Sequence, residues 1–122
     1  MFNTAERIHV ITARSSAVIA RFCDSLGVVN HINEGVSWDP HRSEMSPGEA
    51  IKALIINLLV KRTPLYGVER FYKEMDIPNL FGKAWKPEDF NDDRLGRALE
   101  KMAHSDLPDI YYAIAREALE RE

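Results

Sequence analysis

The sequence predicts an all-α protein, a single compact domain of about six helices around a central buried helix. Residues 46–49, Ser-Pro-Gly-Glu, carry the signature of a helix start: a capping serine, a proline suited to the first helical position, and a glutamate that completes a capping box. Residues 50–60 are then apolar except for Lys52 and Asn57. A helix that is apolar on nearly every side is surrounded by other helices. We therefore place this helix at the centre of the domain.

Length and composition restrict the class of protein. With 122 residues, 45% of them hydrophobic and 29% charged, the chain fits one globular domain with a substantial core. No apolar stretch is long enough for a membrane span, and the N-terminus lacks the pattern of a signal peptide. The single cysteine, Cys23, cannot form an internal disulfide, and the histidines lack zinc-ligand spacing. We expect a cytoplasmic protein without membrane contact, metal or cofactor.

The charges are unevenly distributed along the chain. The formal net charge of −3 does not favour a polyanionic partner over the whole surface. Residues 42–73, however, contain six basic and three acidic side chains, whereas residues 106–122 contain five acidic and two basic ones. We therefore expect any nucleic-acid contact to involve the middle of the chain.

Helix start and stop residues divide the rest of the chain. Residues 1–14 show only a weak alternation of apolar residues, which predicts an irregular N-terminal arm before a helical domain over residues 15–122. The first helix should start at Ser15 or Ser16 and end at Gly27. Further helices are predicted over residues 28–33, 47–62 and 64–75. Two more are predicted to start after capping residues, one after Asn91 and one after Asp106.

Apolar periodicity predicts which side of each helix faces the core. In the first predicted helix the inward residues are Val18, Ile19, Phe22 and Leu26. In the helix over residues 64–75, apolar residues at helical spacing face inward and polar ones face solvent. In the last helix the expected apolar stripe comprises Ile110, Tyr111, Ile114, Ala118 and Leu119.

A first candidate DNA-binding surface follows Pro64. The turn there is short enough for a helix-turn-helix unit, in which the early residues of the second helix meet base edges in the major groove. Tyr66, Arg70 and Lys73 lie on the predicted outer face of that helix. Arg70 could bind guanine bidentately, with Tyr66 and Lys73 on phosphates. The alternative is an ordinary exposed or subunit-facing surface, since Glu69 weakens the positive field.

A second candidate surface is a basic row formed by Arg94, Arg97 and Lys101, which share a helical face. Such a row could contact a phosphate backbone. The alternative is a solvated face in which Asp93 and Arg97 form an i, i+4 pair. The neighbouring Asp92 and Asp93 favour helix capping over two-metal catalysis, because adjacent helical residues diverge by about 100°.

Three segments together resemble one protein family. They are Trp-Asp-Pro at 38–40 with Met-Ser-Pro-Gly-Glu-Ala at 45–50, then Arg-Thr-Pro-Leu-Tyr-Gly-Val-Glu at 62–69, then Asn-Asp-Asp-Arg-Leu-Gly-Arg-Ala-Leu at 91–99. In this order and spacing they are similar to the N-terminal helical domain of bacterial insertion-sequence transposases with a DDE catalytic core. That domain is usually catalogued as a domain of unknown function. The resemblance covers about residues 15–121.

The resemblance implies a non-catalytic part of a larger enzyme. In that family a ribonuclease-H-like domain follows and supplies the metal-binding carboxylates, none of which this chain contains. The implied function is recognition of double-stranded DNA at the transposon terminal repeats. One alternative is dimerisation or docking on the transposase catalytic domain, which the acidic C-terminal segment and Tyr111 and Tyr112 favour. Another is a truncated, non-catalytic remnant. Because no stop residue follows the last helix, we expect the parent protein to continue past Glu122.

Overall fold

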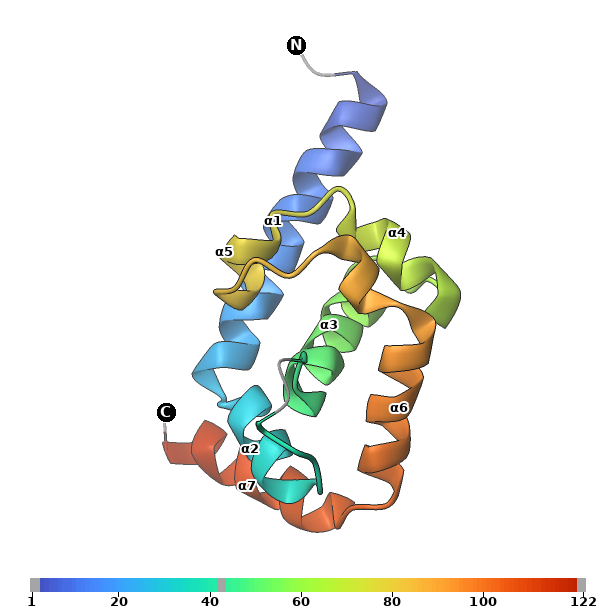
Figure 1. Ribbon diagram of the computed structural model, residues 1–122. Coiled ribbons are helices and arrows are strands. Elements are labelled where there is room, and N and C mark those ends of the chain that lie inside the picture. Colours follow the sequence, from blue (N-terminus) through green and yellow to red (C-terminus); the bar gives the residue numbers. More distant parts are fainter. Residues whose placement is uncertain (1–2, 42–43, 121–122) are drawn as a thin grey trace.

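The computed structural model describes residues 3–41 and 44–120, and these residues are helical without strands. They form a single compact domain around α3, which confirms the predicted fold class (Figure 1). Across the described ranges no helix combines the length and hydrophobicity that a bilayer span requires. The elements are α1 (Thr4–Ser25), α2 (Val28–Gly35), α3 (Pro47–Val60), the 3-10 turn η1 (Leu65–Gly67), α4 (Val68–Tyr72), α5 (Ile77–Phe81), the 3-10 turn η2 (Pro87–Phe90), α6 (Asp92–Ala103) and α7 (Leu107–Glu120).

The start of α3 has the predicted capping box. The Ser46 hydroxyl accepts a hydrogen bond from the Glu49 N–H, and the Glu49 carboxylate accepts one from the Ser46 N–H, each at 3.2 Å. Helices α1, α2 and α6 pack against α3. Burial is complete over the first two turns and ends at Asn57, because Leu58 and Leu59 are 54% and 65% exposed. One side of the last turn of α3 therefore faces solvent, while Val60 still packs against the core.

Tyr72 joins α4 to the core. Its side chain is completely buried, and its hydroxyl donates a 2.6 Å hydrogen bond to the Ala53 carbonyl of α3. The ring stacks on Phe90 with 4.3 Å between centroids and meets Phe71 and Phe81 edge-on. Burial raises the pKa of the Tyr72 hydroxyl well above its ordinary value. This cluster brings α3, α4, α5 and η2 together.

The expected irregular arm over residues 1–14 is wrong for the residues that the structure describes there. From Thr4 onward the chain is already helical, and α1 continues through Ser15 and Ser16 to Ser25. The start is set by a second capping box: the Asn3 side chain accepts from the Glu6 N–H at 2.8 Å, and the Glu6 carboxylate accepts from the Asn3 N–H at 3.2 Å. The prediction overlooked this Asn-x-x-Glu pattern. Residues 1–2 lie outside the described ranges.

The inward face of α1 also differs from the prediction. The buried residues are Ser16, Ala20 and Cys23, whereas Val18 and Phe22 are 67% and 63% exposed. Ile19 and Leu26 of the predicted face are partly buried and pack against the core, so the prediction was right for these two residues and wrong for Val18 and Phe22. The small side chains at the centre of the contact face allow α1 to lie close against α3. The buried Ser16 hydroxyl donates to the Thr12 carbonyl at 2.8 Å, so its burial leaves no donor unpaired.

The helix predicted over residues 64–75 is shorter than expected. The 3-10 turn η1 precedes the five-residue helix α4, and backbone hydrogen bonds three residues apart wind residues 73–75 into tight turns. Val68, Phe71 and Tyr72 are buried, as their spacing predicted. A helix-turn-helix unit in this chain would therefore present two short turns, not a long second helix.

The helices near the C-terminus begin where predicted, but the face of α7 differs. The Arg94 N–H donates to Asn91 at 2.8 Å and the Asp109 N–H donates to Asp106 at 3.2 Å, which confirms both caps. In α7, Ile110 is buried, but Tyr111 and Leu119 of the predicted apolar stripe are 74% and 70% exposed. The reason is that α7 packs mainly on α2, so only a narrow face is covered.

Gly48 permits the close approach of α2 to α3. A methyl group there would overlap the Val29 carbonyl oxygen and crowd the Asn33 side chain, which accepts a 2.7 Å hydrogen bond from the Gly48 N–H. We expect Gly48→Ala to lower the free energy of unfolding by about 1–3 kcal/mol through overpacking. Urea denaturation followed by circular dichroism measures this.

Gly96→Ala is the matched control. Gly96 lies inside α6, and the nearest atom to an added methyl group is Leu65 Cδ2 at 4.0 Å. Alanine there should leave stability unchanged or raise it by up to about 1 kcal/mol, because it favours the helix. Equal effects of the two substitutions would contradict the proposed role of Gly48.

Candidate nucleic-acid interface

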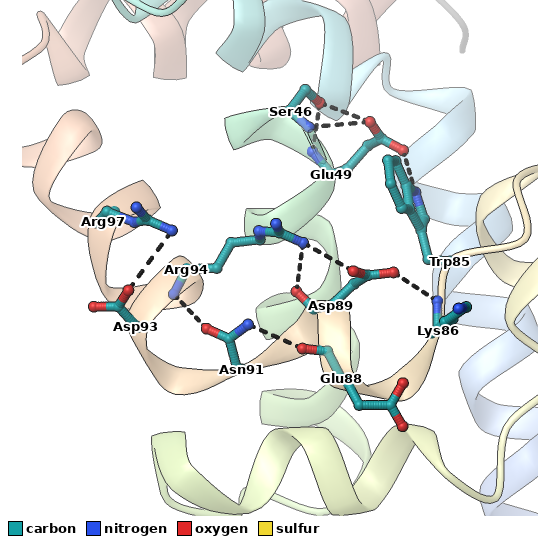
Figure 2. Close-up of polar contacts among 10 residues, drawn as sticks. All are labelled: Ser46, Glu49, Trp85, Lys86, Glu88, Asp89, Asn91, Asp93, Arg94 and Arg97. Atoms are coloured by element: carbon teal, nitrogen blue, oxygen red, sulfur yellow. Dashed lines mark hydrogen bonds and ion pairs between the residues drawn. The ribbon is translucent and has the colours of Figure 1, made fainter. Parts of the chain in front are cut away.

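Asp89 organises the corner between η2 and α6. Its carboxylate accepts a 2.8 Å hydrogen bond from the Lys86 N–H and a 3.2 Å contact from Arg94 Nη1, which also donates to the Asp89 carbonyl at 3.1 Å (Figure 2). Asn91 caps α6 and donates to the Glu88 carbonyl at 2.9 Å. The Asn-Asp-Asp-Arg run thus forms a structural corner, with Asp92 and Asp93 in the first turn of α6.

Of the three cations predicted on α6, Arg94 therefore has a structural role. Its side chain is only 21% exposed and is held by Asp89. Arg97, by contrast, is 57% exposed and forms a long 3.7 Å contact with Asp93, itself 81% exposed. Lys101 is exposed one turn further along the same face. Arg97 and Lys101 are the cations that remain accessible to a ligand.

The α6 row borders a hollow of about 360 Å³ between α6 and the segment that leads into α3. Arg94, Arg97 and Lys101 lie along one side of it. Trp38 lies on another side, where its indole N–H donates to the Asn33 carbonyl at 3.0 Å. Asp39 and Glu44 also border the hollow, so its lining carries both signs of charge. The basic residues of the lining all lie on α6. A phosphate group would contact the α6 side.

The other predicted set lies on η1 and α4. Tyr66 is 77% exposed, and Arg70 and Lys73 are also exposed, as predicted. Arg70 borders a groove of about 380 Å³ that α4 forms with the N-terminal half of α1. Lys61 lies in the same groove. The six predicted residues thus fall into two groups, with Arg70 and the α6 row bordering different hollows.

The groove beside Arg70 was not predicted. Its far side consists of α1 residues, among them Ile8, His9 and Thr12, which lie in the segment predicted to be irregular. The helix start at Asn3 was the available indication, because a helix over residues 4–14 would have placed these side chains on one face. Their position against α4 follows only from tertiary packing.

Glu49 holds the segment before η2 in place and thereby supports the α6 corner. The indole N–H of Trp85 donates to Glu49 at 2.8 Å, and Lys83 Nζ lies 3.3 Å from the same carboxylate. Burial would raise the pKa of the Glu49 carboxyl. The hydrogen bonds from Trp85 and Ser46, with the charge of Lys83, outweigh burial and hold the pKa below its ordinary value of 4.5.

The described part of the chain offers no side-chain cluster that could bind a metal ion. Within residues 3–41 and 44–120, no three His, Cys, Asp or Glu side chains gather where they could hold a metal ion. Cys23 is buried, and burial raises the pKa of its thiol, which opposes the reactive thiolate form.

Comparison with protein families matches residues 10–116 to a family described as domain of unknown function DUF4277. The chain belongs to this family. Comparison with curated proteins and with solved structures finds no match. The DUF4277 match carries no functional assignment.

The division of roles within the α6 row is testable by stability. Arg94→Ala should lower the free energy of unfolding by about 1–2 kcal/mol, because it removes charge-assisted hydrogen bonds at a largely buried corner. Arg97→Ala removes an exposed pair and should cost less than about 0.5 kcal/mol. Urea denaturation of both variants measures the difference. A larger loss for Arg97→Ala would refute the structural role assigned to Arg94.

The Glu49 network predicts a pH dependence of stability. A carboxyl whose pKa is depressed in the folded state stabilises the protein above its unfolded-state pKa, and this contribution disappears as the pH falls through the folded-state pKa. We expect Glu49→Gln to be less stable than the parent at neutral pH. The difference in the free energy of unfolding should shrink once the pH falls below 4.5.

Denaturant titrations across this pH range provide the measurement, and Glu88→Gln is the control because Glu88 is exposed. The prediction would be contradicted if the difference in the free energy of unfolding between the parent and Glu49→Gln stayed constant from neutral to acid pH.

Proposed function

We propose that this domain is the non-catalytic accessory domain of a DDE transposase and contributes to recognition of double-stranded DNA at the transposon ends. The transposase relation is supported by the resemblance at residues 38–40, 45–50, 62–69 and 91–99. The DNA contact is supported by one observation above all. Arg97 and Lys101 stay exposed beside a hollow, although the preceding cation of the row, Arg94, is used within the fold.

Arg97 is suited to exchange its partner for a phosphate. An exposed pair such as Arg97–Asp93 contributes at most about 1 kcal/mol, so little is lost when the arginine turns to a stronger ligand. Arginine and lysine on phosphate release condensed counterions, which supplies much of the affinity for duplex DNA. Lys101, one helical turn away, extends the contact along the same strand.

The second group contributes contacts of the same kind. Helix α4 has five residues and is therefore about 7.5 Å long, whereas the major groove is about 12 Å wide. So short a helix reaches few base pairs. We assign Arg70 and Lys73 mainly to phosphates, which fix register and orientation, and Tyr66, at 77% exposure, to the adjacent sugar-phosphate surface.

The alternative function is protein association, with a second copy or with the catalytic domain of the transposase. It is favoured by the apolar surface of α7, where Tyr111, Tyr112 and Leu119 are 74%, 64% and 70% exposed. Arg116 lies 5.5 Å from the centre of the Tyr112 ring. Aromatic residues with an arginine are enriched in protein interfaces.

DNA binding is tested with a duplex that carries the terminal repeat of the parent element and with a scrambled duplex of equal length. We expect preferred binding to the repeat and falling affinity as salt rises from about 50 to 200 mM. The Arg97→Ala/Lys101→Ala variant should bind at least about tenfold more weakly, with a salt slope smaller by about two. Arg70→Ala/Lys73→Ala should show a similar loss.

Lys86→Ala/Arg116→Ala is the matched control, because it removes two exposed positive charges outside both groups. It should retain most of the binding. If all three double variants bind alike, the assigned surfaces are wrong. If the parent binds neither duplex but forms dimers in light scattering, the association function replaces the DNA function.

A further inference from the structure

The outer face of α1 carries an apolar row that nothing in the described chain covers. It consists of Ile8, Ile11, Val18 and Phe22, which are 59%, 64%, 67% and 63% exposed, and its first residue, Ile8, also borders the groove between α1 and α4. Its N-terminal part extends beyond the other helices (Figure 1). The opposite face of α1 packs on the core through Ser16, Ala20 and Cys23. Helix α1 therefore has two contact faces, of which the fold uses one.

The spacing of the row is that of a coiled-coil seam. From Ile8 the row proceeds by three residues to Ile11, by four to Ser15, by three to Val18 and by four to Phe22. Alternation of three and four keeps a row facing one partner helix along its whole length. Every amphipathic helix, including one on a lipid surface, shows spacings of three and four residues, but a broad apolar face suits a lipid surface. Here the apolar residues are restricted to one narrow row with arginines directly beside it, which is the pattern of a seam between two helices.

A row of arginines runs beside the apolar row at the same period. Arg7, Arg14 and Arg21 are seven residues apart, each directly precedes a position of the seam, and all three are exposed. Within residues 3–41 and 44–120 none of them forms an ion pair. In a coiled coil these are the flanking positions that choose the partner by charge.

A second copy of α1 does not satisfy this pattern. In an antiparallel pair the flanking arginines of the two copies would face each other. In a parallel pair Arg7 and Arg14 would face Thr12 and Ile19 of the other copy, which carry no charge. Duplex DNA would pair with the arginines but would leave the apolar row without a partner. A helix with carboxylates seven residues apart satisfies both rows.

We propose that the outer face of α1 binds an amphipathic acidic helix of a partner protein. Ile8, Ile11, Val18 and Phe22 bury its apolar stripe, and Arg7, Arg14 and Arg21 pair with glutamates or aspartates on its flank. Ile11, Val18 and Phe22 lie apart from the six proposed DNA-contacting residues, whereas Ile8 borders the same groove as Arg70. The inference rests on the apolar and arginine rows of α1 and not on the proposed DNA contact.

The probe is a synthetic three-heptad peptide with leucine and isoleucine in the seam and glutamate at both flanking positions. A control peptide has the same seam with lysine at the flanks. Titration of the fluorescently labelled peptides with the full chain gives both affinities. We expect the acidic peptide to bind at least about tenfold more tightly than the lysine peptide. The ratio of the two affinities should fall as salt rises, because salt screens exposed ion pairs.

Two variants test the two rows. Val18→Glu should abolish binding without loss of fold, because Val18 is 67% exposed, whereas Leu59→Glu at a 65% exposed site on α3 should leave it unchanged. The Arg7→Glu/Arg14→Glu/Arg21→Glu variant should prefer the lysine peptide. Circular dichroism confirms that each variant folds.

Three outcomes would overturn the inference. One is equal affinity of the parent for both peptides, or binding of neither. Another is dimerisation of the parent that Val18→Glu abolishes, which would make a second copy the occupant. The last is loss of duplex DNA binding in the triple arginine variant while peptide binding persists, which would assign the arginines to DNA.

Discussion

The fold depends on two charged side chains that α3 carries into the core. Lys52, 3% exposed, donates to Asp24 at 2.7 Å and to the Leu80 carbonyl at 2.6 Å. Glu49, on the turn before it, receives hydrogen bonds from Ser46 and Trp85. A buried charge is tolerated only when such partners are present. These partners come from α1, from the end of α5 and from the segment before η2. The hydrogen bonds that pair the buried Lys52 and Glu49 therefore also set the positions of those elements.

The same demand for partners decides which cations remain for a ligand. At the start of α6, Arg94 lies close enough to Asp89 and to the η2 backbone to be used within the corner. Arg97 lies one turn further along the helix, with Asp93 as its weak, exposed partner. A row that looks uniform in the sequence is therefore divided into one structural arginine and two accessible cations. The proposed DNA contact uses the accessible part.

Helix α1 shows a related division between its two sides. Ser16, Ala20 and Cys23 are buried against the core with Ile19 and Leu26 packed beside them, whereas Val18 and Phe22 remain outside. Placing bulky apolar residues toward solvent is unfavourable unless a partner covers them. The proposed acidic helix and the α6 row lie on different surfaces, whereas Ile8 of the α1 row shares a groove with Arg70.

The sequence by itself determined the helix boundaries that depend on local capping, at Ser46, Asn91 and Asp106, and the burial of α3 as far as Asn57, because caps and an apolar run are properties of neighbouring residues. The exposure of Leu58 and Leu59 at the end of that run was not predicted. The tertiary structure decided which side of α1 and α7 is covered, how Arg94 is used, and the groove beside Arg70. Apolar periodicity shows that a helix has a face to bury, but the position of the neighbouring helix decides which of its apolar residues are covered. That neighbour lies far away in the sequence, and only the folded chain brings it there.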